Sequence, residues 1–363
     1  MKLSKITTLA TAFMLTASVF QGGIANAAEK VEVRFSAYYP AHYTMFSAGW
    51  KPWQEMVEKD TNGEITFKNY LNGVLNAASH GFRATKSDVC DISTGYPSYV
   101  RGSFNLAHVN DLPFIFPKTH VGPLIMESLY PKYFKKEYEK MGVYLAVWLN
   151  SSGFNLISKK PVRKLEDFKG MKIRSAGGMC NEYLTALGAV PVSLQNSETY
   201  TAMQTGVIDG ALSCSGPADT MKLWENGKYF TKLNIMHMAI PFAMNKKFFD
   251  SLAPEQKKYF YNKLRVASQL ISQCYDTEEK IAEENMLNNG VEIITLSDEE
   301  MARIHKAVEP VVAKFVADNE KKGLPAQQMM ADINALIEKY KELTPEQAME
   351  LVTNNPIQGI INF

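Results

Sequence analysis

The sequence lacks the short motifs that mark common nucleotide-binding and hydrolytic sites. It contains no GxGxxG run after a strand pattern, no P-loop, no HExxH and no GxSxG. Its six histidines are too far apart along the chain to form a local metal-binding motif. These absences argue against a nucleotide-dependent enzyme or a zinc hydrolase, although residues that are distant in sequence can still meet in a folded chain.

Net charge is also almost absent. The 363 residues include 39 Lys and Arg against 38 Asp and Glu, which gives a formal net charge of +1. A nucleic-acid-binding protein usually carries an excess of basic residues on one face, so this balance gives no support for a nucleic acid partner. The chain is 46% hydrophobic and is long enough for two globular domains.

Long apolar runs are absent beyond the N-terminal segment. There, Lys2 and Lys5 precede the stretch ITTLATAFMLTASVF, and small residues follow at Ala25 and Ala27. A basic start, a short apolar core and small residues before the cleavage point are typical of a secretory signal. A membrane anchor is the alternative, but the stretch is short and rich in Thr for a span. We therefore interpret residues 1–27 as a cleaved signal peptide and expect an exported protein.

Cysteine is scarce, with four residues at Cys90, Cys180, Cys214 and Cys274. Their spacing is irregular and includes no CxxC, so we expect no zinc site. An oxidising compartment would permit disulfides. On spacing alone we favour unpaired thiols.

What is present is an alternation of strand and helix patterns. Residues 31–39 alternate apolar and polar side chains as a strand does, and residues 44–63 have the apolar spacing of a helix. A second α/β run begins near 142–158. The segments SDVCDI (87–92) and TGVIDG (205–210) share Val-x-Asp at matching offsets. The pattern predicts α/β units with parallel strands, arranged as two similar lobes that face each other.

The last third of the chain is predicted to be helical. Residues 254–289 form one long helical pattern, which starts at Pro254 and stops before Gly290. At ~1.5 Å per residue, such a helix reaches across a domain or bridges two. A further helix is predicted to begin at Ser297, which is a suitable N-cap residue. We interpret this region as scaffold.

Arg174 is the strongest candidate for a binding residue. It lies in KGMKIRSAGG (169–178), at the predicted carboxyl end of a strand, where ligands of α/β sheets collect. Gly177 and Gly178 allow a close turn into a helix, whose N-terminus favours an anion. The planar guanidinium suits two-point contact with a carboxylate or sulfonate. Pattern alone leaves two alternatives open, a ligand contact and a surface ion pair.

Aromatic residues gather at predicted strand ends. Each of them taken singly is more often a core residue than a pocket residue. Tyr38, Tyr96 and Phe154 follow predicted strands in loop-like positions, so we expect them to line a cleft between the two lobes.

The segment LEDFKGMKIRSAGGMCNEYLTALGAVPVSLQNSETYTAMQTGVIDGALS, residues 165–213, resembles the DctP-type solute-binding proteins of tripartite ATP-independent periplasmic (TRAP) transporters. Further matching stretches are TNGEITFKNYLNGVL (61–75), DLPFIF (111–116) and PFAMNKKFFDSLAPEQ (241–256). The resemblance covers nearly the whole mature chain, and the pattern around Arg174 is specific to the family.

The resemblance implies an α/β, two-lobed type II periplasmic-binding-protein fold with a hinge and a long lobe-spanning helix. We expect residues 28–150 plus about 240–275 to form lobe I. Lobe II is expected to contain residues 151–239 plus about 276–363, with the C-terminal helices.

The family function implied is that of a periplasmic receptor. Such a receptor captures a small organic anion and delivers it to the small and large membrane permease subunits. It uses no cofactor, metal or catalytic residue. Arg174 matches the family residue that clamps the substrate carboxylate. The other expected ligand-binding residues are Tyr38, His42, Tyr96, Asn150, Phe154, Asn196, Ser213 and His237, with the two histidines the looser assignments.

Two departures from the family pattern bear on the ligand. Ser213, in ALSCSG, stands where many members have a ligand-binding Asn, and Phe154 stands where some carry a second Arg. Without that second Arg, one charge of a dicarboxylate would be unpaired. We therefore expect a small monoanion, namely a hydroxy or keto acid or a sulfonate such as isethionate, with a C4-dicarboxylate as the alternative. Cys180 and Cys214 follow the two pocket segments, so a disulfide between them stays open.

Two other functions remain as alternatives. One is a secreted hydrolase that uses a histidine together with Ser213 or Cys214. The other is a ligand-binding protein that serves a sensory receptor instead of a permease.

Overall fold

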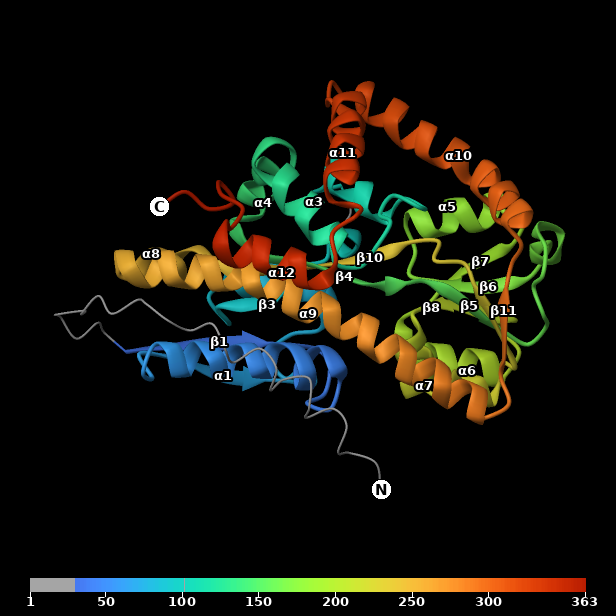
Figure 1. The fold of residues 1–363 in the computed structure, drawn as a ribbon, viewed down its shortest axis with the longest axis horizontal. Coiled ribbons are helices and arrows are strands. Elements are labelled where there is room, and N and C mark those ends of the chain that lie inside the picture. The colour runs from blue at the N-terminus through green and yellow to red at the C-terminus, as the bar shows by residue number, and fades with distance from the viewer. Residues whose placement is uncertain (1–29, 101) are drawn as a thin grey trace.

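The computed structural model describes residues 30–100 and 102–363. Figure 1 shows two α/β lobes side by side along the long axis, with helix α9 (Pro254–Asn288) running across both. The predicted signal peptide, 1–27, lies outside the described residues. Within the described ranges, no helix combines the length and apolar character needed to cross a membrane.

The first lobe is built on a five-stranded sheet in the order β2-β1-β3-β10-β4. Its strands are β1 (Val31–Ser36), β2 (Ile65–Tyr70), β3 (Ile92–Thr94), β4 (Val143–Gly153) and β10 (His237–Asn245). Strand β1 pairs in parallel with β2 and β3, whereas β10 is antiparallel to β3 and β4. An aromatic core lies beside β1, where the rings of Phe35 and Trp50 are 4.8 Å apart. Trp50 also lies 4.7 Å from Phe242 of β10, so these rings tie the sheet to its covering helix.

The helices of the first lobe follow the predicted order. The strand expected at 31–39 and the helix expected at 44–63 are confirmed, with the helical segment divided into a π-helical turn η1 and helix α1. The elements are η1 (Met45–Trp50), α1 (Lys51–Asp60), α2 (Gly81–Lys86), α3 (Val121–Leu129), α4 (Lys135–Met141) and α8 (Lys246–Ser251).

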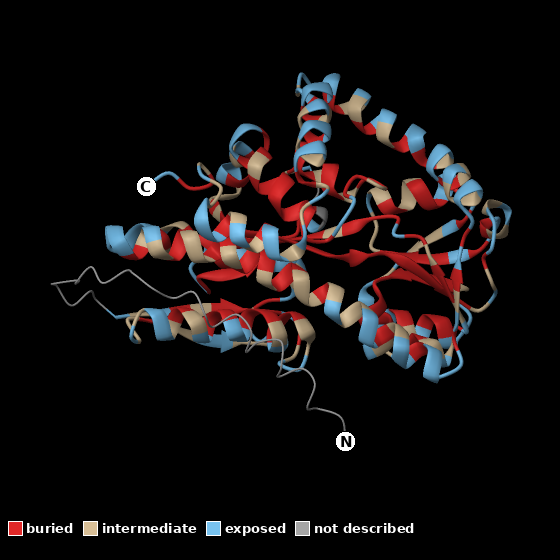
Figure 2. Ribbon diagram, in the orientation of Figure 1, coloured by how far each residue is buried: buried red, intermediate tan, exposed pale blue. Residues whose placement is uncertain are grey.

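The second lobe contains a six-stranded sheet in the order β11-β9-β5-β8-β6-β7. Its strands are β5 (Asn155–Ser158), β6 (Lys172–Ser175), β7 (Val190–Ser193), β8 (Gly210–Ser213), β9 (Tyr229–Lys232) and β11 (Glu292–Thr295). Helices α5 (Met179–Ala186), α6 (Thr199–Gln204) and α7 (Ser215–Thr220) accompany them. Figure 2 shows that the central strands of both sheets are buried and that the outer helical faces are exposed, as amphipathic helices require. The edge strands β2 and β7 carry exposed residues.

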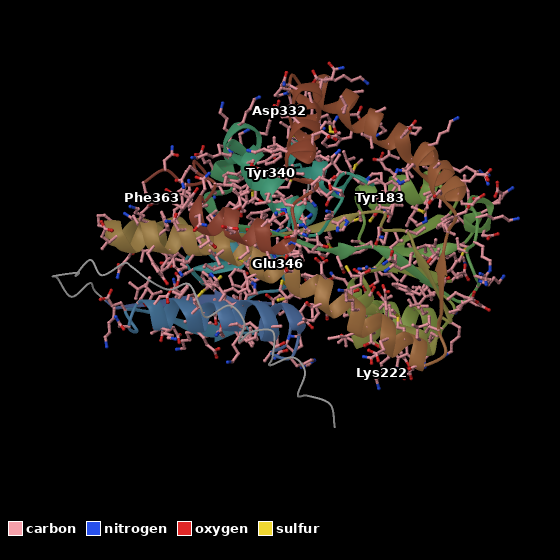
Figure 3. All side chains as sticks on the ribbon, in the orientation of Figure 1. Tyr183, Lys222, Asp332, Tyr340, Glu346 and Phe363 are labelled. Carbon is pink, nitrogen blue, oxygen red and sulfur yellow. The ribbon has the colours of Figure 1, made fainter. Side chains whose placement is uncertain are left out.

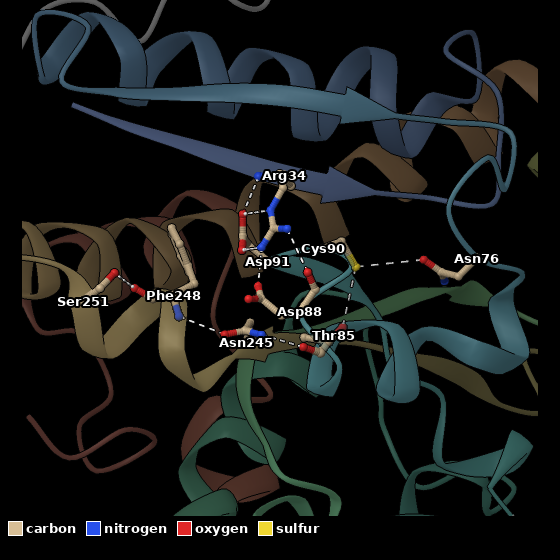
Figure 4. Close-up of polar contacts among 9 residues, drawn as sticks. All are labelled: Arg34, Asn76, Thr85, Asp88, Cys90, Asp91, Asn245, Phe248 and Ser251. Atoms are coloured by element: carbon tan, nitrogen blue, oxygen red, sulfur yellow. Dashed lines mark hydrogen bonds and ion pairs between the residues drawn. The ribbon is translucent and has the colours of Figure 1, made fainter.

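The two Val-x-Asp segments occupy equivalent places in the two sheets. Asp91 precedes β3 and accepts a hydrogen bond of 2.7 Å from the backbone N of Arg34 on β1, as Figure 4 shows. Asp209 precedes β8 and accepts one of 2.8 Å from the backbone N of Lys172 on β6. In both lobes, therefore, the aspartate satisfies a donor of the neighbouring parallel strand, which gives the sequence repeat a structural meaning.

Two extended segments connect the lobes. Strand β4 continues through Phe154 into β5, and the chain returns from β9 into β10 through residues 233–236. The segments are hydrogen-bonded to each other, from Phe154 N to Met236 O at 2.8 Å and from Ile235 N to Phe154 O at 3.0 Å. The two-lobed fold expected from the sequence is confirmed.

The C-terminal helices connect both lobes instead of belonging to the second. They are α10 (Asp298–Glu320), α11 (Ala326–Tyr340) and α12 (Pro345–Asn354). Ile304 and Val308 of α10 belong to the second-lobe core, but Met329 and Ile333 of α11 and Val352 of α12 belong to the first-lobe core. Helix α11 packs on α3, and α12 lies along α9 (Figure 1). This packing differs from the expected placement of the C-terminal helices in lobe II, because an apolar stripe alone does not say which lobe will bury it.

Candidate ligand-binding site between the lobes

Arg174 is buried without a carboxylate partner. It lies on β6, between Val192 of β7 and Ala211 of β8. It is only 6% exposed, and its Nε donates a 3.1 Å hydrogen bond to the backbone oxygen of Leu194. Within residues 30–100 and 102–363, no acidic side chain forms an ion pair with it. Burial lowers the pKa of Arg174, which measures the cost of keeping this charge away from water.

The chain after Arg174 turns sharply towards helix α5. Gly177 and Gly178 have φ angles of +91° and +61°, which side chains larger than hydrogen rarely adopt. The backbone N of Gly177 donates a 3.1 Å hydrogen bond to Ser175 Oγ, and α5 then begins at Met179. The glycine pair therefore brings backbone N–H groups close to the end of β6, as the sequence predicted.

Tyrosines of the first lobe interact electrostatically with Arg174. Tyr38 follows β1 and Tyr96 follows β3, and their hydroxyl oxygens are 3.2 Å apart. Tyr38 is 39% exposed, but partial desolvation of its hydroxyl raises its pKa, and the positive charge of Arg174 acts in the opposite direction. Tyr99, whose ring lies 5.4 Å from that of Tyr96, also interacts electrostatically with Arg174. Sequence reasoning missed Tyr99, although it stands three residues after Tyr96 in the same loop.

A narrow cavity lies at the boundary of the two lobes. The first lobe contributes Tyr96 and Asp111 to its wall, and the second contributes Gly177 and Cys180. Met238, at the start of β10, completes the apolar part. The cavity therefore lies beside the loop that follows Arg174. Neither Asp111 nor Met238 was among the predicted ligand-binding residues. Asp111 begins the DLPFIF stretch, which is the one sequence feature that could have pointed to it.

Three of the remaining predicted residues are buried near the crossover segments. Ser213 is 2% exposed on β8 and pairs in register with Asn155. Phe154 is 7% exposed and joins the apolar core of the second lobe. His237 Nδ1 lies 3.1 Å from the backbone oxygen of Ser151, and burial lowers the pKa of its imidazole. His237 therefore interacts with the hinge backbone and is neutral near pH 7.

Asn150 lies on β4 beside His237 and Ala239 of β10, whereas His42 and Asn196 lie at the surface. Asn150 is fully buried and its Nδ2 lies 3.4 Å from the backbone oxygen of His237. A Cβ added at Gly122 would lie 2.5 Å from that nitrogen, so Asn150 is packed tightly against α3. His42 and Asn196 are exposed, and neither side chain hydrogen-bonds another residue in the described part of the chain.

All four cysteines are free, so the preference for unpaired thiols is confirmed and the Cys180–Cys214 disulfide is wrong. Cys180 contacts Tyr183 Oη and lies 3.5 Å from Met236 Sδ, whereas Cys214 Sγ lies 3.4 Å from the backbone oxygen of Ser152. Burial raises the pKa of Cys214 to about 12, so its thiol is not ionised near pH 7. Among described contacts, no histidine hydrogen-bonds Ser213 or Cys214, so the hydrolase alternative gains no support.

Comparison with known proteins decides the family. Residues 35–319 match the model of bacterial extracellular solute-binding protein family 7, DctP. The chain belongs to this family. Members of the family bind solutes for transport, and TRAP receptors are among its solved relatives. The resemblance drawn from the segment around Arg174 is thereby confirmed.

Individual DctP relatives cover most of the chain. The C4-dicarboxylate-binding periplasmic protein DctP of Rhodobacter capsulatus is 28% identical over 78% of this chain and 86% of that relative. A TRAP periplasmic solute-binding protein from Desulfovibrio salexigens, solved as an open complex, has a TM-score of 0.75 and 25% identity, covering 87% of this chain and 98% of its own. A TRAP protein from Pseudomonas putida with bound D-glucuronate has a TM-score of 0.70 and 25% identity over 84% and 97%.

Proposed function

We propose that this DctP-family protein captures a small organic monoanion in the periplasm, with Arg174 as its principal contact, and delivers it to the membrane subunits of a TRAP transporter. The ligand class proposed is a hydroxy or keto acid, or a sulfonate such as isethionate. The observation that carries the proposal is the buried guanidinium of Arg174, which pairs with no carboxylate in the described structure.

The energetic argument concerns the charge of Arg174. A buried cation without a partner is costly, and a bound anion would offset that cost. The Nε of Arg174 is already used by the oxygen of Leu194, which leaves its terminal nitrogens to donate. A charge-assisted hydrogen bond contributes ~1.5–3 kcal/mol. Two such bonds would supply a large part of a micromolar affinity, which corresponds to ~8 kcal/mol.

The choice of a monoanion rests on the residues around the cavity. Phe154 is packed into an apolar core where a second arginine would be needed for a second carboxylate. The charged side chain that lines the cavity, Asp111, is negative and would repel a dianion. Tyr38, which interacts electrostatically with Arg174, and Tyr96, whose hydroxyl lies 3.2 Å from that of Tyr38, are proposed as further contacts, with Ser213 at the end of β8.

The relatives support an organic acid as the ligand, but they differ in which acid they bind. The Rhodobacter capsulatus relative is named for C4-dicarboxylates, and the Pseudomonas putida structure holds D-glucuronate. Both ligands carry a carboxylate that an arginine could clamp. A dicarboxylate is therefore the alternative that the binding test must include.

Isothermal titration calorimetry with lactate, pyruvate, propionate, isethionate, ethanesulfonate and succinate tests this proposal. We expect one of the monoanions to bind most tightly, and Arg174→Ala to weaken it by about 100-fold or more. The matched control is Arg303→Ala, because Arg303 is a surface arginine of α10 paired with Glu166. Unchanged affinity in Arg174→Ala would contradict the clamp assignment, and tighter binding of succinate would contradict the monoanion.

A further inference from the structure

We infer that Asp111 is a specificity-determining residue of the cleft, one that favours organic anions carrying a hydroxyl or ammonium donor over donor-free anions of the same shape. This inference rests on the proposed function, because it concerns the end of the ligand opposite the group held by Arg174. The observations that lead to it are the cavity wall, the unused acceptor of Asp111 and the placement of the two opposite charges.

Asp111 contributes to the cavity from the first lobe. It is the last residue of the 3-10 helix η4 (Leu106–Asp111), and it lines the same cavity as Tyr96, Gly177 and Cys180. Its side chain is 24% exposed, so it is partly withdrawn from water without being sealed in the core. Most of the wall around it is apolar, which makes its carboxylate the strongest hydrogen-bond acceptor there.

One carboxylate oxygen of Asp111 is available to a ligand. Oδ2 lies 3.1 Å from Nδ1 of His108, which fixes the orientation of the carboxylate. The other oxygen, Oδ1, accepts no hydrogen bond from any residue in the described ranges. An acceptor oriented by one partner and free on its other side is suited to receive a donor from a bound molecule.

Asp111 lines the cavity directly, whereas Arg174 lies on β6, just before the lining residues Ala176 and Gly177. Burial raises the pKa of Cys180 to about 11, while the charge of Asp111 adds to that rise and the charge of Arg174 opposes it. Burial also raises the pKa of Tyr183, which Figure 3 labels on the second lobe. The charge of Asp111 raises this pKa further, and the charge of Arg174 lowers it. Asp111 and Arg174 form no ion pair with each other. The carboxylate in the cavity wall and the guanidinium that precedes the wall residues Ala176 and Gly177 in the chain therefore do not neutralise each other.

In the proposed binding mode, Arg174 would hold the acid group of the ligand, and the other end of the ligand would approach the cavity wall at Asp111. A hydroxy acid, a hydroxysulfonate or an amino acid would satisfy both groups. A donor-free anion would bring its methyl group to Asp111 and leave a partly desolvated carboxylate unpaired, which a binding site penalises strongly. We expect a preference of about tenfold or more for the donor-bearing member of a matched pair.

Calorimetric titration of two matched pairs tests the inference: lactate against propionate, and isethionate against ethanesulfonate. The wild-type protein should bind the hydroxylated member of at least one pair about tenfold more tightly. In Asp111→Ala the hydroxylated member should bind more weakly and the donor-free member at least as tightly as in wild type. A general loss of structure would weaken both, so the opposite signs distinguish specificity from damage.

The matched control is Asp332→Ala, because Asp332 lies on α11, apart from Tyr183 in Figure 3, and pairs with Lys132. It should leave both affinities and their ratio unchanged. Equal affinity for both members of each pair in the wild type would overturn the inference even if Asp111→Ala fails to fold. If no anion binds, or if Arg174→Ala binds as wild type does, the proposed function itself fails.

Discussion

Two buried arginines in this molecule differ in their partners: one is paired with a carboxylate and the other is not. Arg265, on α9, is fully buried, and its NH1 lies 2.7 Å from Oε1 of the equally buried Glu127 on α3. The same Glu127 oxygen accepts a 3.1 Å hydrogen bond from the backbone N of Trp148. Arg174, on β6, is almost as deeply buried, but its described hydrogen bond goes to one backbone carbonyl.

We interpret Arg265 as a structural charge and propose that Arg174 is the charge that binds the ligand. Removal of a guanidinium from water is costly, and within the first lobe Glu127 offsets that cost for Arg265. Nothing in the described chain does so for Arg174. In the proposed function an anion would neutralise this charge, so we expect ligand binding to stabilise the fold.

The largest effect is expected when the paired arginine is removed. Arg265→Met leaves the carboxylate of Glu127 buried and unpaired, so the free energy of unfolding should fall by about 3–5 kcal/mol in urea titrations. The double variant Arg265→Met with Glu127→Leu should recover much of that loss, since both buried charges are then gone. A loss below about 1 kcal/mol in the single variant would mean that the pair does not stabilise the lobe.

A smaller effect on stability is expected from two histidines, whose pKa values are shifted in opposite directions. Burial lowers the pKa of His237, whose partner is a backbone oxygen. Burial also lowers the pKa of His108, but the hydrogen bond and negative charge of Asp111, together with the charge of Glu137, outweigh burial, and the net pKa is raised above 6.5. The contribution of His237 to stability is therefore lost as the pH falls below 6.5. That of His108 is complete below 6.5 and is lost as the pH rises through its folded-state pKa.

NMR titration of the histidine ring protons measures these two values directly. The midpoint of His108 should lie above that of His237, and Asp111→Ala should lower the midpoint of His108 while leaving His237 unchanged. The reverse order of midpoints in the wild type would contradict the assigned pairing of His108 with Asp111.

Sequence reasoning recovered the features that depend on local pattern. Arg174, the glycine turn after it, the long helix from Pro254 and the Ser297 cap all follow from residue type and spacing, and the structure contains each of them. The capping contact, for example, is a 3.3 Å hydrogen bond from the backbone N of Glu300 to Ser297 Oγ. Such features need no knowledge of which distant segments meet.

What sequence reasoning missed depends on contacts between distant segments. Asp111 reaches the cavity because its loop packs against the second lobe, through a 2.7 Å hydrogen bond from Phe114 N to Ile235 O. Helix α11 packs on the first lobe for the same kind of reason, since its apolar stripe meets α3. Asn196 was placed by alignment to the family pattern, yet its side chain is exposed.

Thermal melting of three proteins, with and without a saturating amount of whichever probe anion binds, tests the central claim most directly. Without the anion, Arg174→Ala should melt at or above the wild-type temperature, whereas Arg265→Met should melt well below it. With the anion, wild type and Arg265→Met should both be stabilised, and Arg174→Ala should show no shift. An Arg174→Ala protein that melts as low as Arg265→Met and keeps the ligand-induced shift would contradict the account.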